Sequence, residues 1–382
     1  MRVLTAGAGV AGLESGLALK ALAGERVELT LISPERDFVY RPVSVLEPFV
    51  DAPPRKLSLA SFVADVGAKH EVGTLERVEP ERRLVHVSDG RALSYDALVI
   101  ASGARLEQIG RGSIQLDISA IGASLHPLVQ DIDRGSINSV AFVAPRPTWP
   151  LLSYELALLS RARAHERGAE LAISVVSEGA RPVQELGPAV SDAVAQVLQE
   201  AGIDTIGEAG PIDSDAASIT TAAGTLAFDR VVAVPRLRGP GIDGLPSDGR
   251  GFLPIDLGGA LLDVEHVYAA GDASDFPVKF GGVAARQADA VASAIAAAAG
   301  APVEPRSFDG IVHGVLLNPA GRRSVYFSVR FDEGVVCESR VSDSSESAAW
   351  APEAKLDAVY LAAYLDERWA DGPPWLSAVP RQ

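Results

Sequence analysis

The sequence predicts an α/β fold of two parallel-sheet domains, the second inserted in the first, with a small C-terminal α+β region. Three observations lead to this prediction. A strand, a glycine-rich turn and a helix follow one another within residues 2–22. A second strand–turn–helix unit occupies residues 139–163, and a late apolar strand within residues 263–275 precedes an alanine-rich helix. We expect the late strand to return to the first sheet after the second unit.

The N-terminal unit has the pattern of a Rossmann-like domain. Between the predicted strands 2–6 and 26–33, glycines occur in GxGxxG spacing at the start of an apolar helix. The first glycine permits the tight turn, the second lets a pyrophosphate approach the backbone, and the third allows close helix–strand packing. The pattern therefore predicts a dinucleotide site at this turn, formed by Gly7, Gly9, Ala11 and Gly12.

The second strand ends at Ser33, where an acidic residue usually binds the ribose hydroxyls. Ser33 can still accept one hydrogen bond, and Glu35 lies nearby. The sequence predicts that Ser33 belongs to the dinucleotide site.

Composition excludes several classes of function. A net charge of -16 and an isoelectric point near 4.9 argue against nucleic acids and anionic membrane surfaces as partners. The single cysteine, Cys337, excludes an internal disulfide and cysteine-rich metal sites, and the scattered histidines predict no metal site. No stretch has the length and hydrophobicity of a signal peptide or a membrane span, so we expect a cytoplasmic protein.

Two apolar strands predict further parts of the site. One ends in Ala101-Ser102-Gly103, and the late strand ends in Ala270-Gly271-Asp272. Together with the glycine turn, these strand ends resemble the pyridine nucleotide–disulfide oxidoreductase superfamily of flavoproteins. The resemblance implies a bound FAD, with Asp272 on its ribityl chain. It also implies that the following helix directs its positive N-terminal end at the flavin pyrimidine, through Gly281, Gly282 and Val283.

The segment "LISPERDFVYRP" (31–42) narrows the resemblance to the branch of sulfide:quinone oxidoreductase and type II NADH dehydrogenase. In that branch, the region around Lys279 and Gln287 approaches the isoalloxazine ring. The resemblance covers residues 1–305 and implies that Pro42 and Val43 shape one face of a non-covalent flavin. Lys279 would stabilise the reduced ring and protonate an acceptor such as a quinone. The alternative is a solvated loop lysine.

The resemblance also implies a domain division. The chain is expected to divide into an FAD-binding domain in two parts (1–107 and 241–305), an inserted NAD(P)-like domain (108–240) and a C-terminal α+β region (306–382).

Sulfide oxidation needs a pair of cysteines beside the flavin, because their disulfide must be attacked by sulfide and then re-formed as the flavin takes up the electrons. A chain with Cys337 alone cannot perform this chemistry, nor disulfide reduction. We expect Cys337 to be a small buried side chain on a strand.

The inserted domain has an unusual phosphate loop. In "VAFVAPRPTWPLLSYELALL" (140–159), prolines stand where glycines are expected, and they remove backbone N–H donors. This disfavours tight NAD(P)H binding in the standard pose. Trp149 either plugs a vestigial site or forms an aromatic platform. Glu155 is expected to be a helix-start charge, and Glu178, at the end of the next strand, is placed to bind a ribose.

The C-terminal region is expected to contain antiparallel strands around a Pro-Ala-Gly turn, and a helix near residues 352–369. The acidic residues of this helix favour docking on its own domain or on a dimer partner, rather than on a membrane.

We therefore expect an FAD-dependent oxidoreductase with small-molecule electron donors and acceptors. Two alternatives stay open. One is an NAD(P)H:quinone-type reductase with an atypical nicotinamide site. The other is a non-catalytic flavoprotein in which the second domain binds a partner. Flavin reduction by a physiological donor separates them.

Overall fold

The computed structural model describes residues 1–50, 54–210, 212–319, 324–342 and 355–369. Its first sheet has five parallel strands in the order β20-β9-β1-β2-β5. These strands are β1 (Arg2–Ala6), β2 (Glu28–Ile32), β5 (Lys69–Glu71), β9 (Ala97–Ile100) and β20 (Val267–Ala269). Because β20 pairs with β9 across a long sequence separation, the second sheet is inserted in the first domain, as predicted.

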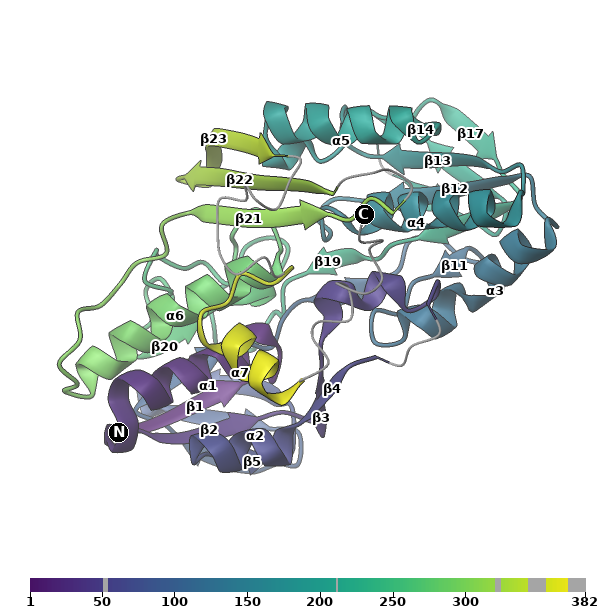
Figure 1. Ribbon diagram of the computed structural model, residues 1–382. Coiled ribbons are helices and arrows are strands. Elements are labelled where there is room, and N and C mark those ends of the chain that lie inside the picture. Colours follow the sequence, from purple (N-terminus) through teal and green to yellow (C-terminus); the bar gives the residue numbers. More distant parts are fainter. Residues whose placement is uncertain (51–53, 211, 320–323, 343–354, 370–382) are drawn as a thin grey trace.

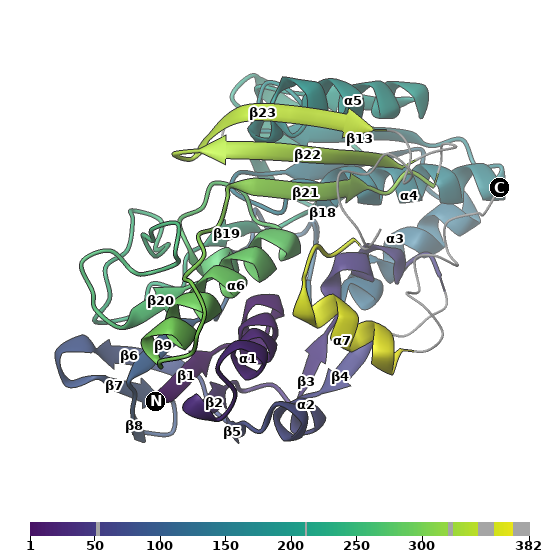
Figure 2. The ribbon, with the colours of Figure 1, turned by 60° about the vertical axis from the view of Figure 1, so that its left-hand side comes forward.

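Each face of the first sheet has its own covering layer, the helices in Figure 1 and the antiparallel meander in Figure 2. On β1, Val3 belongs to the core shared with the helices, whereas Leu4 packs with a three-stranded antiparallel meander. The helices α1 (Val10–Ala23) and α6 (Gly281–Ala298) contact each other closely. The remaining elements of this part are α2 (Leu59–Val66), the antiparallel pair β3 (Asp37–Val39) and β4 (Lys56–Ser58), and the meander β6 (Leu75–Glu79), β7 (Leu84–Val87) and β8 (Ala92–Ser94).

The second sheet also has five parallel strands, in the order β11-β18-β12-β13-β14. Where the chain passes between the two sheets, β10 (Arg105–Glu107) pairs with β19 (Arg236–Arg238). The elements of this part are β11 (Ile114–Gln115), α3 (Ile121–Arg134), β12 (Ser139–Ala144), α4 (Leu152–Arg167), β13 (Ala172–Ser177), α5 (Pro188–Glu200), β14 (Ile203–Ile206), β15 (Asp213–Ser214), β16 (Ser218–Thr221), β17 (Gly224–Ala227) and β18 (Arg230–Ala233).

The C-terminal strands form an antiparallel sheet that contacts α5 and α6 (Figure 2). The strands are β21 (Ile311–Leu316), β22 (Val325–Asp332) and β23 (Val335–Ser342). The Pro-Ala-Gly turn continues outside the described residues. Cys337 is exposed, so the expectation of a buried thiol was wrong. On β23 the neighbouring residue, Val336, packs against the core, and strand alternation turns Cys337 to the opposite face.

The C-terminal helix, α7 (Tyr360–Arg368), is shorter than predicted. Residues 355–359 are not helical, so the predicted helix start is wrong over that stretch. The carboxylate of Glu14, buried on α1, accepts hydrogen bonds from the N–H groups of Tyr360 (2.9 Å) and Leu361 (2.5 Å). Glu14 therefore caps α7 from another element, which fixes where the helix begins. Within the described residues, no helix is long and apolar enough to cross a bilayer.

Asp289 on α6 gives a prediction for the pH dependence of stability. Burial and the neighbouring Glu14 raise the pKa of Asp289 from 3.8 to about 8. Between these values the folded chain binds more protons than the unfolded chain, so the stability contributed by this group falls as the pH rises. We expect Asp289→Asn to be more stable than the wild type by at least about 1 kcal/mol at pH 8. The advantage disappears towards pH 4. Urea denaturation across this pH range measures it, and a constant difference would contradict the assignment.

Candidate functional site

The turn between β1 and α1 is closed on one side and open on the other. A Cβ on Gly7 (φ +116°) would lie 2.1 Å from the carbonyl oxygen of Ala101, and one on Gly12 would lie 1.9 Å from that of Gly7. Neither position has room for a side chain. A Cβ on Gly9 would meet nothing within 4 Å. The backbone at Gly9 is therefore accessible to a ligand.

The start of α1 offers backbone donors at the same place. The first helical hydrogen bond runs from Leu13 N to Gly9 O (3.0 Å), so the N–H groups of Val10, Ala11 and Gly12 have no acceptor within the helix. Such a helix start favours a negatively charged group. The GxGxxG turn thus has the local geometry that the sequence predicts.

Ser33 lies buried at the carboxyl end of β2. Its hydroxyl oxygen accepts the N–H of Glu35 at 3.2 Å, and its carbonyl oxygen lies 3.1 Å from Nε2 of His70. Glu35 itself is exposed. The end of this strand is therefore a tightly bonded turn.

The other predicted strand ends lie next to the glycine turn. Ala101 is buried against Gly7, whereas Ser102 is exposed. Gly271 has φ +76°, and a Cβ there would lie 2.9 Å from that of Ala284 on α6 and 3.4 Å from that of Ala11 on α1. The structure therefore brings the residues following β1, β9 and β20 together at one edge of the sheet. Gly103, also with positive φ, continues the chain beyond Ser102.

Asp272 connects the two Rossmann-like domains. Its Oδ2 accepts a hydrogen bond of 2.9 Å from the indole Nε1 of Trp149. Burial raises the pKa of Asp272, while the charge of Lys279 and the indole N–H act in the opposite direction. The loop that the sequence analysis placed at the vestigial nucleotide site thus extends to the first domain.

Lys279 is 3% exposed, so the alternative of a solvated lysine is wrong. Its Nζ donates to the carbonyl oxygen of Ser274 and lies 4.2 Å from the ring centroid of Phe252. Burial lowers the pKa of Lys279 to about 8, although Asp272 and Asp275 oppose the shift. A positive charge is therefore held beside Asp272, and it titrates close to neutral pH.

Gln287 is buried on α6 and supports the turn that carries Asp272. Its Oε1 accepts the N–H of Gly271 at 2.8 Å and the hydroxyl of Ser274 at 3.3 Å. These two hydrogen bonds stabilise the turn over residues 271–274, which includes Asp272.

The start of α6 is covered in part by the C-terminal segment. A Cβ on Gly281 would lie 2.8 Å from Cδ1 of Leu356 and 4.0 Å from atoms of Pro42 and Val10. Val10 begins α1, and Pro42 belongs to the short 3-10 helix η2 (Arg41–Leu46), which also carries the buried Val43.

The next residues of α6 are also covered. A Cβ on Gly282 would lie 3.1 Å from that of Asp357, and Val283 is buried. The sequence analysis missed this contribution of residues 356–357.

Charged contacts of Asp357 and Lys355 fix that segment. The carboxylate of Asp357 lies 2.8 Å from Nδ1 of His313 and 3.3 Å from Arg286. Lys355 forms a buried ion pair with Glu155 on α4, at 2.6 Å. Glu155 also accepts the N–H of Leu317 at 2.9 Å. Glu155 lies in the first turn of α4, as expected, and the C-terminal segment and the end of β21 cover it in addition.

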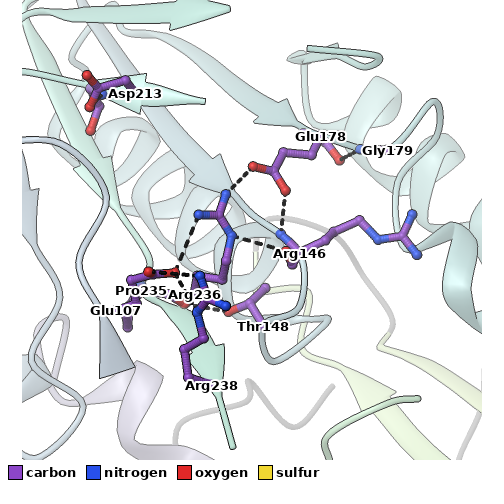
Figure 3. A network of polar contacts seen from close by, with 11 residues as sticks. Glu107, Arg146, Thr148, Glu178, Gly179, Asp213, Pro235, Arg236 and Arg238 are labelled. Atoms are coloured by element: carbon purple, nitrogen blue, oxygen red, sulfur yellow. Dashed lines mark hydrogen bonds and ion pairs between the residues drawn. The ribbon is translucent and has the colours of Figure 1, made fainter. Parts of the chain in front are cut away.

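The predicted ribose ligand of the second domain is engaged in an internal network (Figure 3). Glu178 accepts the backbone N–H of Arg146 at 2.9 Å and forms an ion pair with Arg236. Nε of Arg236 in turn donates to the carbonyl oxygen of Arg146 at 3.1 Å. Ionic and backbone partners therefore already use the carboxylate of Glu178.

The proline-rich loop is bonded to the chain that leaves β18. Thr148 donates its hydroxyl to the carbonyl oxygen of Pro235 (3.0 Å), and Leu237 donates its N–H to that of Pro147 (2.8 Å). The loop is thus fixed at Pro147 and Thr148.

Two surface hollows are lined by none of the predicted flavin residues. One, of about 90 Å³, lies between η2 and α4, where Phe49 and Leu159 line it. The other, of about 420 Å³, is polar and lies at β15 and β16. Among the described residues, no three His, Cys, Asp or Glu side chains are placed to bind a metal ion.

Comparison with known proteins identifies the fold. No family model matches the chain. Sulfide:quinone oxidoreductase from the hyperthermophilic bacterium Aquifex aeolicus superposes with a TM-score of 0.78 at 16% identity, covering 90% of this chain and 87% of that one. The chain has the fold of the FAD-dependent pyridine nucleotide–disulfide oxidoreductases. With one cysteine, it has no redox disulfide.

Two further flavoprotein structures agree with this fold. A ferredoxin reductase from Rhodopseudomonas palustris matches with a TM-score of 0.66 at 21% identity, covering 87% of this chain and 84% of its own. The water-forming NADH oxidase from Lactobacillus brevis matches with a TM-score of 0.66 at 16% identity, covering 86% and 75%. At these identities the likeness establishes the fold.

Proposed function

We propose that this chain is an oxidoreductase that binds FAD non-covalently and transfers electrons through it without a redox disulfide. The observation that carries the proposal is the glycine turn, which is closed against the sheet at Gly7 and Gly12 and open at Gly9. When bound, FAD supplies the electron-transfer chemistry. The residues of the chain bind and orient it and set the charge around it.

In this proposal, residues at this edge of the sheet bind the parts of FAD in order. The N–H groups at the start of α1 would bind the pyrophosphate, Ser33 the adenosine ribose, and Asp272 the ribityl hydroxyls. The remaining site residues would line the cofactor along its length: Pro42, Val43, Ala101, Ser102, Gly103, Gly271, Gly281, Gly282 and Val283.

Lys279 would supply a positive charge near the ring end of this site. Its ammonium is held by the carbonyl of Ser274 and the ring of Phe252, in a place where water does not screen it. A cation there favours negative charge on a neighbouring group, and a lysine with a pKa of about 8 can also give up a proton near neutral pH.

The electron donor, in this proposal, is not NAD(P)H bound in the standard pose. The loop of the second domain lacks glycines, and Glu178 is engaged by Arg146 and Arg236. The two alternatives are an NAD(P)H:quinone-type reductase with an atypical nicotinamide site, and a flavoprotein that acts through a partner. We favour a small-molecule donor and acceptor, with a quinone as one candidate acceptor, because the usual nicotinamide-binding groups of the second domain are absent or already bonded.

An anaerobic reduction experiment tests the proposal. The FAD-loaded protein receives NADH, NADPH or dithionite separately, and its flavin absorbance is followed. The protein reduced by dithionite is then mixed with a soluble quinone. We expect slow bleaching by both nicotinamides, full bleaching by dithionite, and reoxidation by the quinone faster than that of free reduced FAD. Rapid bleaching at micromolar NADH would overturn the assignment of the donor. Reoxidation no faster than that of free reduced FAD would favour the non-catalytic alternative.

A further inference from the structure

One side chain of the second domain, that of Trp149, contacts a residue of the proposed flavin site. Trp149 stands in the proline-rich loop, next to Thr148, whose hydroxyl ties the loop to Pro235. The indole of Trp149 is partly buried against the main core, and its N–H donates to Asp272. A loop that no longer has the glycines to bind a phosphate is thus used to hold an aspartate of the other domain.

The two carboxylate oxygens of Asp272 differ in their hydrogen bonding. Oδ2 accepts the indole N–H, and within the described residues we find no hydrogen-bond partner for Oδ1. Burial raises the pKa of Asp272 and so favours its neutral form. The groups that oppose this shift are the indole N–H, Lys279 from the following loop and Arg41 at the start of η2.

An indole has a particular advantage in this position. It donates a hydrogen bond but carries no charge and does not titrate, so it orients the carboxylate without neutralising it. The carboxylate then retains its full strength as an acceptor, and hydrogen bonds to an ionised acceptor are stronger than neutral ones.

Resting on the proposed function, we propose that Trp149 is a positioning residue of the FAD site, supplied by the second domain. Its indole holds Asp272 as an oriented carboxylate whose free Oδ1 accepts a ribityl hydroxyl. In this proposal the former nucleotide loop assists flavin binding.

The test is FAD binding to flavin-free protein, measured by calorimetry at a series of pH values. We expect Trp149→Phe to raise the dissociation constant about tenfold, the size of effect that a hydrogen bond to a charged group has. The pH at which acid weakens FAD binding should also move upward, because the carboxylate has lost a donor. Trp149→His, which keeps a ring N–H, should recover part of the affinity.

Matched variants separate positioning from packing. Trp369→Phe changes another partly buried tryptophan, which packs edge-on against Tyr40 at 5.5 Å, and should leave the pH midpoint unchanged. In an Asp272→Ala background, which removes the acceptor of the indole N–H, Trp149→Phe should have little further effect on FAD affinity, because the two residues act as one unit.

The possible outcomes distinguish the two proposals. Equal FAD affinities and pH profiles for the wild type and Trp149→Phe would overturn the inference alone. A weaker FAD affinity of Trp149→Phe with an unmoved pH midpoint, additive with the effect of Asp272→Ala, would also overturn it, since that result describes packing. If Trp149→Phe does not fold, Trp149→His replaces it, and an effect on FAD affinity that is equal in the wild-type and Asp272→Ala backgrounds would overturn the inference. A wild type that does not bind FAD would overturn the proposed function itself.

Discussion

Replacing Gly12 by alanine is expected to lower the free energy of unfolding by about 3 kcal/mol or more, at the upper end of what overpacking costs. The new Cβ would lie 1.9 Å from the carbonyl oxygen of Gly7. That carbonyl cannot easily move, because the N–H of Gly7 is bonded to Ile32 at 2.8 Å and its Cα approaches Ala101. The helix α1 would have to move away from the first sheet. Urea denaturation followed by circular dichroism measures the effect.

Gly9→Ala is the matched control for this prediction. Gly9 caps α1, and a Cβ there meets nothing within 4 Å, so the change should cost less than about 1 kcal/mol. The new methyl group would nevertheless occupy the side from which a pyrophosphate approaches. We therefore expect Gly9→Ala to fold normally and to lose most of its affinity for FAD. Unaltered FAD binding by this variant would contradict the placement of the pyrophosphate.

Lys355→Met is expected to cost about 3–5 kcal/mol, because it leaves a buried carboxylate without its counter-charge. The side chains of Lys355 and Glu155 are only 10% and 3% exposed. After the substitution, Glu155 would keep only its bond to the N–H of Leu317. Since the pair joins the C-terminal segment to α4, we also expect faster proteolysis of residues 355–369. Chemical denaturation and limited proteolysis measure the two effects.

Two controls accompany this prediction. Adding Glu155→Gln removes the buried charge and keeps an acceptor for Leu317, so the double variant should recover much of the lost stability. Arg368 lies on the same C-terminal segment and forms an exposed ion pair with Asp65 on α2. Arg368→Met breaks this pair and should cost no more than about 1 kcal/mol. Equal losses for Lys355→Met and Arg368→Met would show that burial of the Glu155 pair has no special effect.

Local patterns in the sequence predicted the two sheets and the glycine turn correctly. Strand periodicity, glycine spacing and a helix start are encoded within about 30 residues, the length of one strand–helix–strand unit. The late strand β20 was predicted as well, because its Ala-Gly-Asp ending marks the return to the first sheet. The shortened helix α7 was not, since its first residue is set by Glu14 on a distant element.

The contacts that distinguish this chain are long-range and polar. The hydrogen bond from Trp149 to Asp272 spans 123 positions, and the ion pair between Lys355 and Glu155 spans 200. Hydrophobic periodicity predicts local elements and not pairs of distant polar residues. The sequence therefore left two alternatives for Trp149 and indicated only a minor role for Glu155. The burial of Lys279 was missed for the same reason, because its surroundings come from separate segments such as that of Phe252.

Titration of flavin-free protein with FAD tests the central claim most directly. The account predicts saturable binding of one FAD per chain, with the absorption bands of a protein-bound flavin, and a sharp loss of affinity in Gly9→Ala. The absence of saturable binding by the folded wild type would contradict the account. The fold would then be that of a flavoprotein, but the open turn at Gly9 would hold some other ligand or none.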